Sequence, residues 1–184
     1  MHTIFVGGVH GVGKSTCCEQ AARALGIQHH SASAMIKSQQ AEAISTTGKA
    51  VVSPAANQRL LIQAVSTFFT TGEKVLLLDG HFTIPTTAGH VEPIPVDVFE
   101  ALNIRAVVVL VEEPHVIHDH RKGRDGNAPD VIAIEFAQAM ELEHAGRIAC
   151  AMTCPLTILA SNDKTAFVAA IQKISLEVAR GNPA

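Results

Sequence analysis

Eight consecutive residues near the start of the chain combine glycines, a lysine and a serine in a spacing that suits phosphate chemistry. Residues 8–15, GVHGVGKS, fit the pattern G-x-x-x-x-G-K-[ST] without a mismatch. Glycines let the backbone turn its N–H groups inward around a phosphate, and the N-terminus of a following helix adds positive charge behind them. Lys14 would then reach the β- and γ-phosphates, and the Ser15 hydroxyl would bind Mg²⁺. The residues expected to bind a nucleoside triphosphate are Gly8, His10, Gly11, Val12, Gly13, Lys14, Ser15 and Thr16.

A carboxylate follows the apolar run at residues 74–78. Asp79 ends this run, as the second acidic element of a phosphate-binding-loop (P-loop) protein does, and would there hold Mg²⁺ or its water shell. The alternative is a solvated carboxylate at the end of a strand. The P-loop favours the metal-binding interpretation, which makes Ser15 and Asp79 the predicted metal ligands.

Two arginines, Arg121 and Arg124, flank a glycine in the segment RKGRDGN at residues 121–127. Phosphoryl transfer spreads negative charge over the moving group, and arginines on a mobile loop can neutralise that charge and exclude water. Gly123 and Gly126 would supply the mobility. A solvated basic turn explains the local sequence equally well, so both interpretations stay open at this stage.

The elements that must position these residues alternate between strand and helix. Short apolar runs predict strands, and apolar residues at helical spacing predict helices. Strands are expected over 2–6, 27–30, 74–79, 104–111 and 156–160. Helices are expected over 14–25, 31–40, 54–71, 96–102, 114–122, 130–151 and 163–180, with a loop over 80–95 and a glycine-rich turn over 123–129.

This alternation, with continuous apolar strands, predicts a single α/β domain over residues 1–184 whose parallel sheet is covered by helices on both faces. In such sheets ligands bind at the carboxyl ends of the strands. The P-loop, Asp79, Glu112 and Asn162 all fall at or just beyond strand ends. We therefore expect them to surround one site.

Composition excludes several classes of protein. The net charge is -3 and the pI is about 6.3, and no basic cluster indicates nucleic-acid binding. No segment reaches the roughly 20 apolar residues of a membrane span, and the chain enters its first strand without a signal peptide, so we expect a cytoplasmic protein. The four cysteines lack the C-x-x-C spacing of a zinc site, which favours buried free thiols.

The ordered motifs, taken together, resemble the adenylate-kinase-like group of P-loop nucleotide kinases, and most of all the archaeal-type adenylate kinases. The resemblance rests on residues 8–15, on Asp79-Gly80 after an apolar strand, on the two arginines of a short lid, on Gln58-Arg59, on His81 and the long segment up to Pro95, and on Asn162-Asp163 after the last strand. It implies a P-loop NTPase-type three-layer fold with a five-stranded parallel sheet in the order 2-3-1-4-5. It also implies acceptor-binding helices over about 31–71 and a lid over about 121–130.

The resemblance further implies transfer of the γ-phosphate of MgATP to a nucleoside monophosphate such as AMP. Lys14, with the loop amides, would bind the donor phosphates, and Arg121 and Arg124 would stabilise the transferring group. Asn162 and Asp163 would lie near the adenine. The residues that would face the acceptor are Ser33, Lys37, Arg59 and His81.

The acceptor region departs from the pattern of that group. Adenylate kinases carry an arginine on the first acceptor helix, where this chain offers Lys37, and a lysine cannot grip a phosphate with a two-pronged fork. His81-Phe82 follows Asp79-Gly80 where many nucleotide kinases carry Phe-Pro-Arg. His81 could bind or orient the acceptor or act as a base, and could equally be a strand-end histidine bonded to the backbone.

These observations predict an ATP-dependent phosphotransferase with Mg²⁺ as cofactor and a small-molecule acceptor. Two alternatives remain: a P-loop ATPase or nucleotide-dependent switch that acts with a protein partner, and a kinase of a non-nucleotide small molecule. A switch would need the P-loop and Asp79 but no acceptor pocket. The acceptor pocket is therefore the feature that separates these functions.

Overall fold

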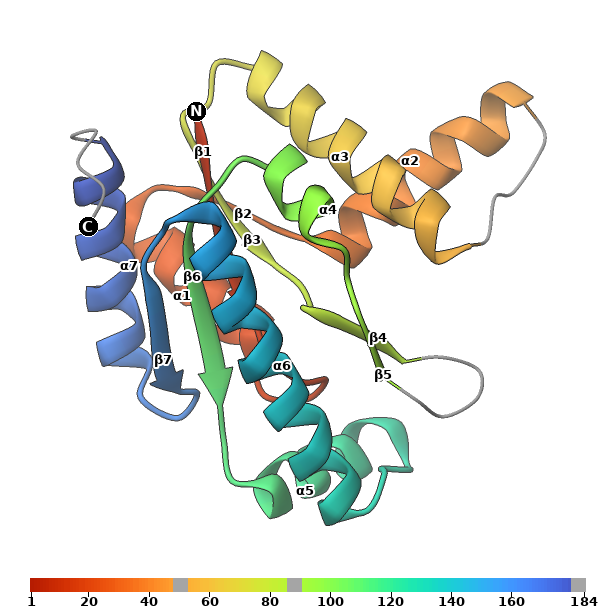
Figure 1. Cartoon of the computed structure of the whole chain (residues 1–184), viewed down its shortest axis with the longest axis vertical. Helices are drawn as coiled ribbons and strands as arrows, with labels where there is room; N and C mark the ends of the chain where they lie inside the picture. The colour runs from red at the N-terminus through yellow and green to blue at the C-terminus, as the bar shows by residue number, and fades with distance from the viewer. Residues whose placement is uncertain (48–52, 86–90, 180–184) are drawn as a thin grey trace.

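The computed structural model describes residues 1–47, 53–85 and 91–179 and is built on a five-stranded parallel sheet. The strands lie in the order β2-β3-β1-β6-β7 (Figure 1). Counted without the two strands of a separate hairpin, this is the predicted order 2-3-1-4-5, and the P-loop NTPase-like α/β fold is confirmed. The strands are β1 (His2–Gly7), β2 (Gln28–Ser31), β3 (Val75–Asp79), β6 (Ile104–Val111) and β7 (Leu156–Ala160).

Helices cover both faces of the sheet. One apolar cluster joins α1, α5 and α7 to one face, and a second joins α2, α3, α4 and most of α6 to the other (Figure 1). The helices of the described residues are α1 (Lys14–Leu25), α2 (Ala32–Thr47), α3 (Pro54–Thr70), α4 (Val96–Ala101), α5 (Pro114–Asp125), α6 (Val131–Met152) and α7 (Lys164–Ala179).

The central strand β1 shows why the apolar runs are continuous. Side chains alternate between the two faces of a strand, and both faces here are buried. Ile4 and Val6 therefore belong to the α1–α7 cluster, while Phe5, between them, belongs to the α2–α6 cluster. All six residues of β1 are buried.

Polar side chains fix three helix starts that the sequence predicts. Ser53 Oγ accepts a hydrogen bond from the N–H of Ala56 at 3.2 Å, ahead of Pro54 at the start of α3. The side chains of Asp130 and Asp163 accept from N–H groups three residues further on, at 2.7 and 2.8 Å. Such caps satisfy backbone donors that a helix start leaves without partners.

Three local expectations are wrong. The helix expected over 31–40 continues as α2 to Thr47. The loop expected over 80–95 contains an antiparallel hairpin of β4 (Thr83–Pro85) and β5 (Val91–Pro93), each strand only three residues long and ending in proline. The turn expected to begin at Gly123 begins later, because α5 continues to Asp125 and ends at Gly126, whose φ of 73° is the left-handed conformation that closes a helix.

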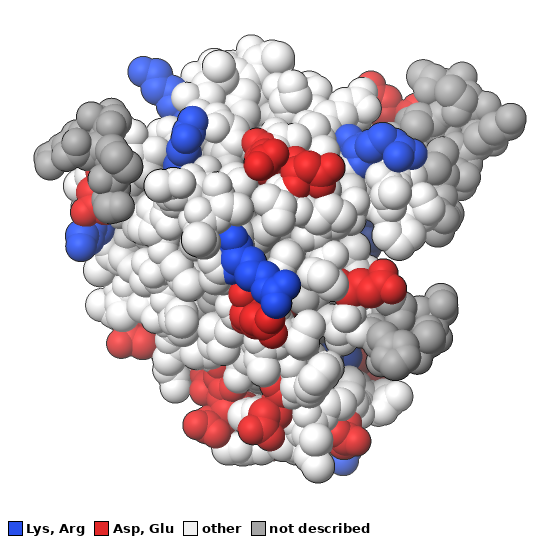
Figure 2. Space-filling view, viewed as in Figure 1, with Lys and Arg blue, Asp and Glu red and all other residues white. Residues whose placement is uncertain are grey.

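The charged side chains on one face of the molecule are spread out (Figure 2). Lysines and arginines on the face seen in Figure 2 are scattered singly rather than gathered into a patch. Among the described helices, none is both long and apolar enough to cross a membrane.

Candidate active site

A cavity of about 1190 Å³ lies at the carboxyl ends of the strands. The P-loop, between β1 and α1, forms one wall, and α2, α3, α4 and the β4–β5 hairpin surround the other end. Figure 2 shows the molecule hollowed between the α2–α3 pair and the hairpin. Of the residues predicted to form a site, those that line this cavity are His10, Gly11, Val12, Gly13, Lys14, Ser15, Thr16, Ser33, Asp79, His81, Arg124 and Asn162.

At two positions of the P-loop, the backbone conformation and the neighbouring atoms leave no room for a side chain. Gly8 has a φ of 141°, and a Cβ there would lie 2.5 Å from the carbonyl oxygen of Leu110. Gly11 has a φ of 86°, and a Cβ there would lie 2.5 Å from Cγ of Arg121. Because L side chains rarely adopt such φ values, the loop is restricted to glycine at these points.

Lys14 is 7% exposed and points back into the loop. Its Nζ donates to the carbonyl oxygens of Gly8 at 2.7 Å and Val9 at 3.0 Å. Burial lowers the pKa of Lys14 to about 8. Burial disfavours the charged form of Lys14, so the negative charge of a bound phosphate would stabilise its ammonium group.

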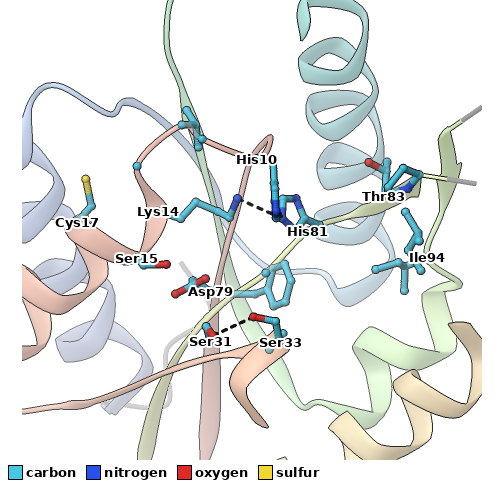
Figure 3. Close-up of a pocket in the computed structure, with 18 of the residues that line it drawn as sticks. His10, Lys14, Ser15, Cys17, Ser31, Ser33, Asp79, His81, Thr83 and Ile94 are labelled. Atoms are coloured by element: carbon cyan, nitrogen blue, oxygen red, sulfur yellow. Dashed lines mark hydrogen bonds between the residues drawn. The ribbon is translucent and has the colours of Figure 1, made fainter. Parts of the chain in front are cut away.

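Two histidines meet beside Lys14. His10 Nδ1 and His81 Nε2 are 2.9 Å apart, and Lys14 Nζ lies 3.5 Å from the same His81 nitrogen (Figure 3). Burial, then the nearby charge of Lys14, lowers the pKa of His81 to about 2, and burial also lowers the pKa of His10. Both shifts favour the neutral form of these imidazoles at pH 7.

A buried carboxylate on α6 ties the P-loop to the segment after β3. Glu141 is 1% exposed. It accepts hydrogen bonds from the N–H of Gly8 at 3.1 Å, of Phe82 at 3.0 Å and of Thr83 at 2.9 Å, and from the Thr83 hydroxyl at 2.6 Å. Its Oε1 also lies 3.8 Å from His81 Nδ1. Glu141 thus fixes both walls of the cavity next to Lys14.

Asp79 faces the cavity from the end of β3, and in Figure 3 its carboxylate and the Ser15 hydroxyl point into the same part of the pocket. One carboxylate oxygen is 2.6 Å from His29 Nε2. Cys18 lies beside this pair. Its sulfur, a ring nitrogen of His29 and a carboxylate oxygen of Asp79 all lie within 4.8 Å of one another. Asp79 therefore pairs with His29 on β2, a contact that the position of Asp79 at the end of a strand does not predict.

Both arginines of the expected lid lie on α5. Arg124 lines the cavity and donates two hydrogen bonds of 2.7 Å to the adjacent Asp125. Arg121 packs its stem across Gly11, and its Nε is buried without a hydrogen-bond partner among the described residues. Each arginine is thus within the neighbourhood of the P-loop, but on a helix rather than on a loop.

The remaining predicted site residues lie apart from the cavity wall. Gly8 is buried behind the loop, Asp163 caps α7, and Lys37 and Arg59 are exposed on α2 and α3 and do not line the cavity. The described α2–α3 residues that do line it carry hydroxyl, amide or aliphatic side chains. They are Ala32, Ser33, Ile36, Pro54, Asn57, Gln58 and Leu61.

The sequence analysis does not predict two residues of this site, Glu141 and His29. Glu141 could have been found, because it is a carboxylate at a core position of an amphipathic helix, seven residues after buried Ile134 and seven before buried Ile148. His29 carries no such signal. Its place beside Asp79 depends on the pairing of β2 with β3, which the local sequence does not specify.

The comparisons with known proteins agree with this architecture. None of the curated proteins matches the chain. A gluconokinase from Sinorhizobium meliloti 1021 has a similar structure, with a TM-score of 0.52 and 14% sequence identity over 96% of this chain and 97% of that one. This likeness shows the fold alone. The model of a protein family described as AAA domain matches residues 7–136, which hold the P-loop, Asp79 and both arginines of α5. The chain therefore belongs to this family of P-loop proteins.

Proposed function

We propose that the protein transfers the γ-phosphate of MgATP to a hydroxyl group of a small molecule. The observation that carries this proposal is one continuous cavity that begins at the P-loop and extends between α2, α3, α4 and the β4–β5 hairpin. A nucleotide alone does not require the second half of this space. Holding donor and acceptor side by side supplies most of what phosphoryl transfer needs, because the reaction depends on alignment and charge neutralisation.

The residues at the donor end fit a magnesium-bound triphosphate. Ser15 and Asp79 present hard oxygen ligands to the same part of the cavity, which suits Mg²⁺, and the ion would supply charge neutralisation at the phosphates. Lys14 and the loop amides would bind the phosphates, and Arg124 would leave Asp125 to contact the transferring group. Asn162 and Lys164, which also line the cavity, would face the nucleoside end.

The acceptor end is polar but weakly charged. Ser31, Ser33, Asn57 and Gln58 can exchange hydrogen bonds with hydroxyl groups, and Ile84, Ile94, Val98 and Phe99 offer apolar contact. Among the described lining residues, α2, α3, α4 and the hairpin contribute no lysine or arginine. This composition favours an uncharged, hydroxyl-bearing acceptor.

A nucleoside monophosphate such as AMP is the second candidate acceptor. The size of the cavity supports it, since about 1190 Å³ exceeds the upper end of ordinary single-ligand pockets, which is roughly 1,000 Å³. Its phosphate would need Lys37 or Arg59 to turn inward from their exposed positions. An ATPase or nucleotide-dependent switch would leave the acceptor half of the cavity without a role.

The test is MgATP turnover, followed as ADP formed, against one panel of nucleoside monophosphates and one of neutral polyols and nucleosides. Reactions without an acceptor and with Lys14→Ala provide the blanks. A phosphorylated product of one panel member, formed far above the blank, supports the kinase and names the acceptor class. Equal ADP formation with and without every acceptor would reject the kinase in favour of an ATPase. Arg59→Glu then separates the two acceptors, since it should impair only transfer to a monophosphate.

A further inference from the structure

Three potential metal ligands from three different elements meet under the P-loop helix. Parallel pairing places His29 of β2 opposite Leu77 of β3, so both side chains project from the same face of the sheet. Asp79, two residues after Leu77, projects from that face as well. Leu77 packs in the same apolar cluster as Cys18 of α1. The topology therefore brings the thiol, the imidazole and the carboxylate together.

The spacing of the ligand atoms is close to that around one ion. All three atoms lie within 4.8 Å of one another, and His29 Nε2 and Asp79 Oδ2 are 2.6 Å apart. Zinc–ligand bonds of about 2.0–2.3 Å in a tetrahedron put neighbouring ligand atoms roughly 3.3–3.8 Å apart. The His29–Asp79 distance lies below this range and no pair exceeds 4.8 Å, so binding would move the imidazole and the carboxylate apart.

We propose that Cys18, His29 and Asp79 form a binding site for a divalent transition-metal ion such as Zn²⁺. A sulfur ligand with an imidazole suits a borderline-soft ion and disfavours Mg²⁺ and Ca²⁺, which prefer oxygen. On binding, the Cys18 thiol releases its proton to solvent. The proton that His29 Nε2 shares with Asp79 moves by way of solvent to Nδ1 of the same ring, and two metal–ligand bonds replace the His29–Asp79 hydrogen bond. Three protein ligands leave a fourth position, open toward the cavity that Asp79 lines, for water or a phosphate oxygen.

The site is sheltered but reachable. Cys18 is 0% exposed, while the side chains of His29 and Asp79 are 11% and 7% exposed. An ion would therefore enter past the carboxylate and the imidazole and meet the sulfur last. In so doing it would take Asp79 away from the Mg²⁺ of the donor nucleotide, a consequence that rests on the proposed function. Zinc would then inhibit the transferase at the metal-binding carboxylate.

Binding is tested with Co²⁺ on the full-length chain, because a thiolate ligand gives cobalt a charge-transfer band in the near ultraviolet, and four-coordinate cobalt gives intense visible bands. We expect one ion per chain and competition by Zn²⁺. Cys18→Ser should abolish the charge-transfer band, and His29→Gln should lower the affinity by more than the roughly 10–100-fold that follows loss of an outer-shell partner. Cys17→Ser is the matched control, since Cys17 is buried one residue away and its sulfur contacts the Ser161 carbonyl oxygen instead.

Absence of the band in the wild-type chain, or its persistence in Cys18→Ser, would overturn the proposal. If Cys18→Ser does not fold by circular dichroism, the His29→Gln titration decides, and an unchanged affinity would reject the site. These measurements involve no turnover, so they stand whether or not the protein is a kinase. Zinc inhibition of turnover that is relieved in Cys18→Ser would connect the site to the proposed function.

Discussion

Glu141 on α6 accepts a hydrogen bond from the backbone N–H of Gly8, 133 residues earlier in the chain, at 3.1 Å. The same carboxylate holds the N–H groups of Phe82 and Thr83. One buried anion thus positions the first residue of the P-loop and the segment that carries His81.

Replacing this anion should cost stability. Glu141→Gln substitutes one accepting oxygen by an NH₂ group and leaves buried N–H donors without a partner, at a cost of about 1–3 kcal/mol for each. We expect the free energy of unfolding to fall by ~2–4 kcal/mol, measured by urea denaturation. Glu143→Gln is the control, because this exposed residue of the same helix pairs only with Arg147 among the contacts described, and should change stability by less than about 1 kcal/mol. Equal effects of both substitutions would contradict the role of Glu141.

Gly11→Ala should abolish nucleotide binding with a smaller effect on folding. The new Cβ would have to adopt a φ of 86° and would lie 2.5 Å from Cγ of Arg121, so the loop must change shape. Gly123→Ala is the control: a Cβ there meets nothing within 4 Å, and a helical alanine should stabilise the chain by about 0.5–1 kcal/mol. Calorimetric titration with MgATP gives the affinities. If Gly11→Ala retains its affinity for MgATP, phosphate binding does not depend on this conformation of the loop.

Arg124→Ala should slow turnover by about 10³-fold or more with little change in the affinity for MgATP, as loss of a charge-stabilising arginine does in other phosphoryl transfers. The comparison is Lys122→Ala, which removes an exposed cation from the same helix away from the cavity wall. Single-turnover rates measure the chemical step. If both variants retain the wild-type rate, Arg124 has no part in the transition state.

Lys14 should take up a proton when the nucleotide binds. Burial lowers the pKa of its ammonium group to about 8, and bound phosphates would raise that pKa again. At pH 8.5 we expect an uptake of up to ~0.8 proton per chain. The affinity for MgATP should fall as the pH rises through 8, because the neutral amine then has to be protonated on binding. Calorimetry in buffers of different ionisation enthalpy measures the uptake, and a value near zero at pH 8.5 would argue against contact between Lys14 and phosphate.

Acid should destabilise the fold through His81. Its folded pKa is lowered to about 2 from 6.5, so below pH 6.5 the unfolded chain binds a proton that the folded chain does not. The stability present above pH 6.5 is therefore lost as the pH falls, by at most ~1.4 kcal/mol per pH unit, and by less here because 31% of the side chain is exposed. His81→Gln should lose less stability than the wild type between pH 7 and pH 5. Parallel urea titrations of the two chains measure this difference, and identical pH profiles would contradict it.

How much the sequence predicts depends on how local each feature is. The P-loop, the five core strands and the capped starts of α3, α6 and α7 are encoded in contiguous residues, and all are found where the sequence places them. The β4–β5 hairpin is not, because three-residue strands that end in Pro85 and Pro93 fall below the length at which alternation can be recognised. The end of α5 is set by Gly126 rather than by Gly123, and either glycine fits the local pattern.

The same difference between local and tertiary features applies to the residues of the site. Residues that belong to a contiguous motif can be predicted from the sequence, and those that meet through tertiary pairing cannot. His29 reaches Asp79 across 50 residues of sequence, and Glu141 reaches Thr83 across 58. No local periodicity encodes such pairs, because they depend on which strands and helices become neighbours.

The contact between Glu141 and Gly8 has a consequence during protein synthesis. Every residue of the P-loop has been made once Thr16 is in place, yet the carboxylate that accepts from Gly8 and from the segment after β3 lies far downstream. A nascent chain that stops before α6 therefore has the complete motif without the anion that orders it. The contact that joins the P-loop to the segment after β3 can therefore form only after translation has passed residue 141.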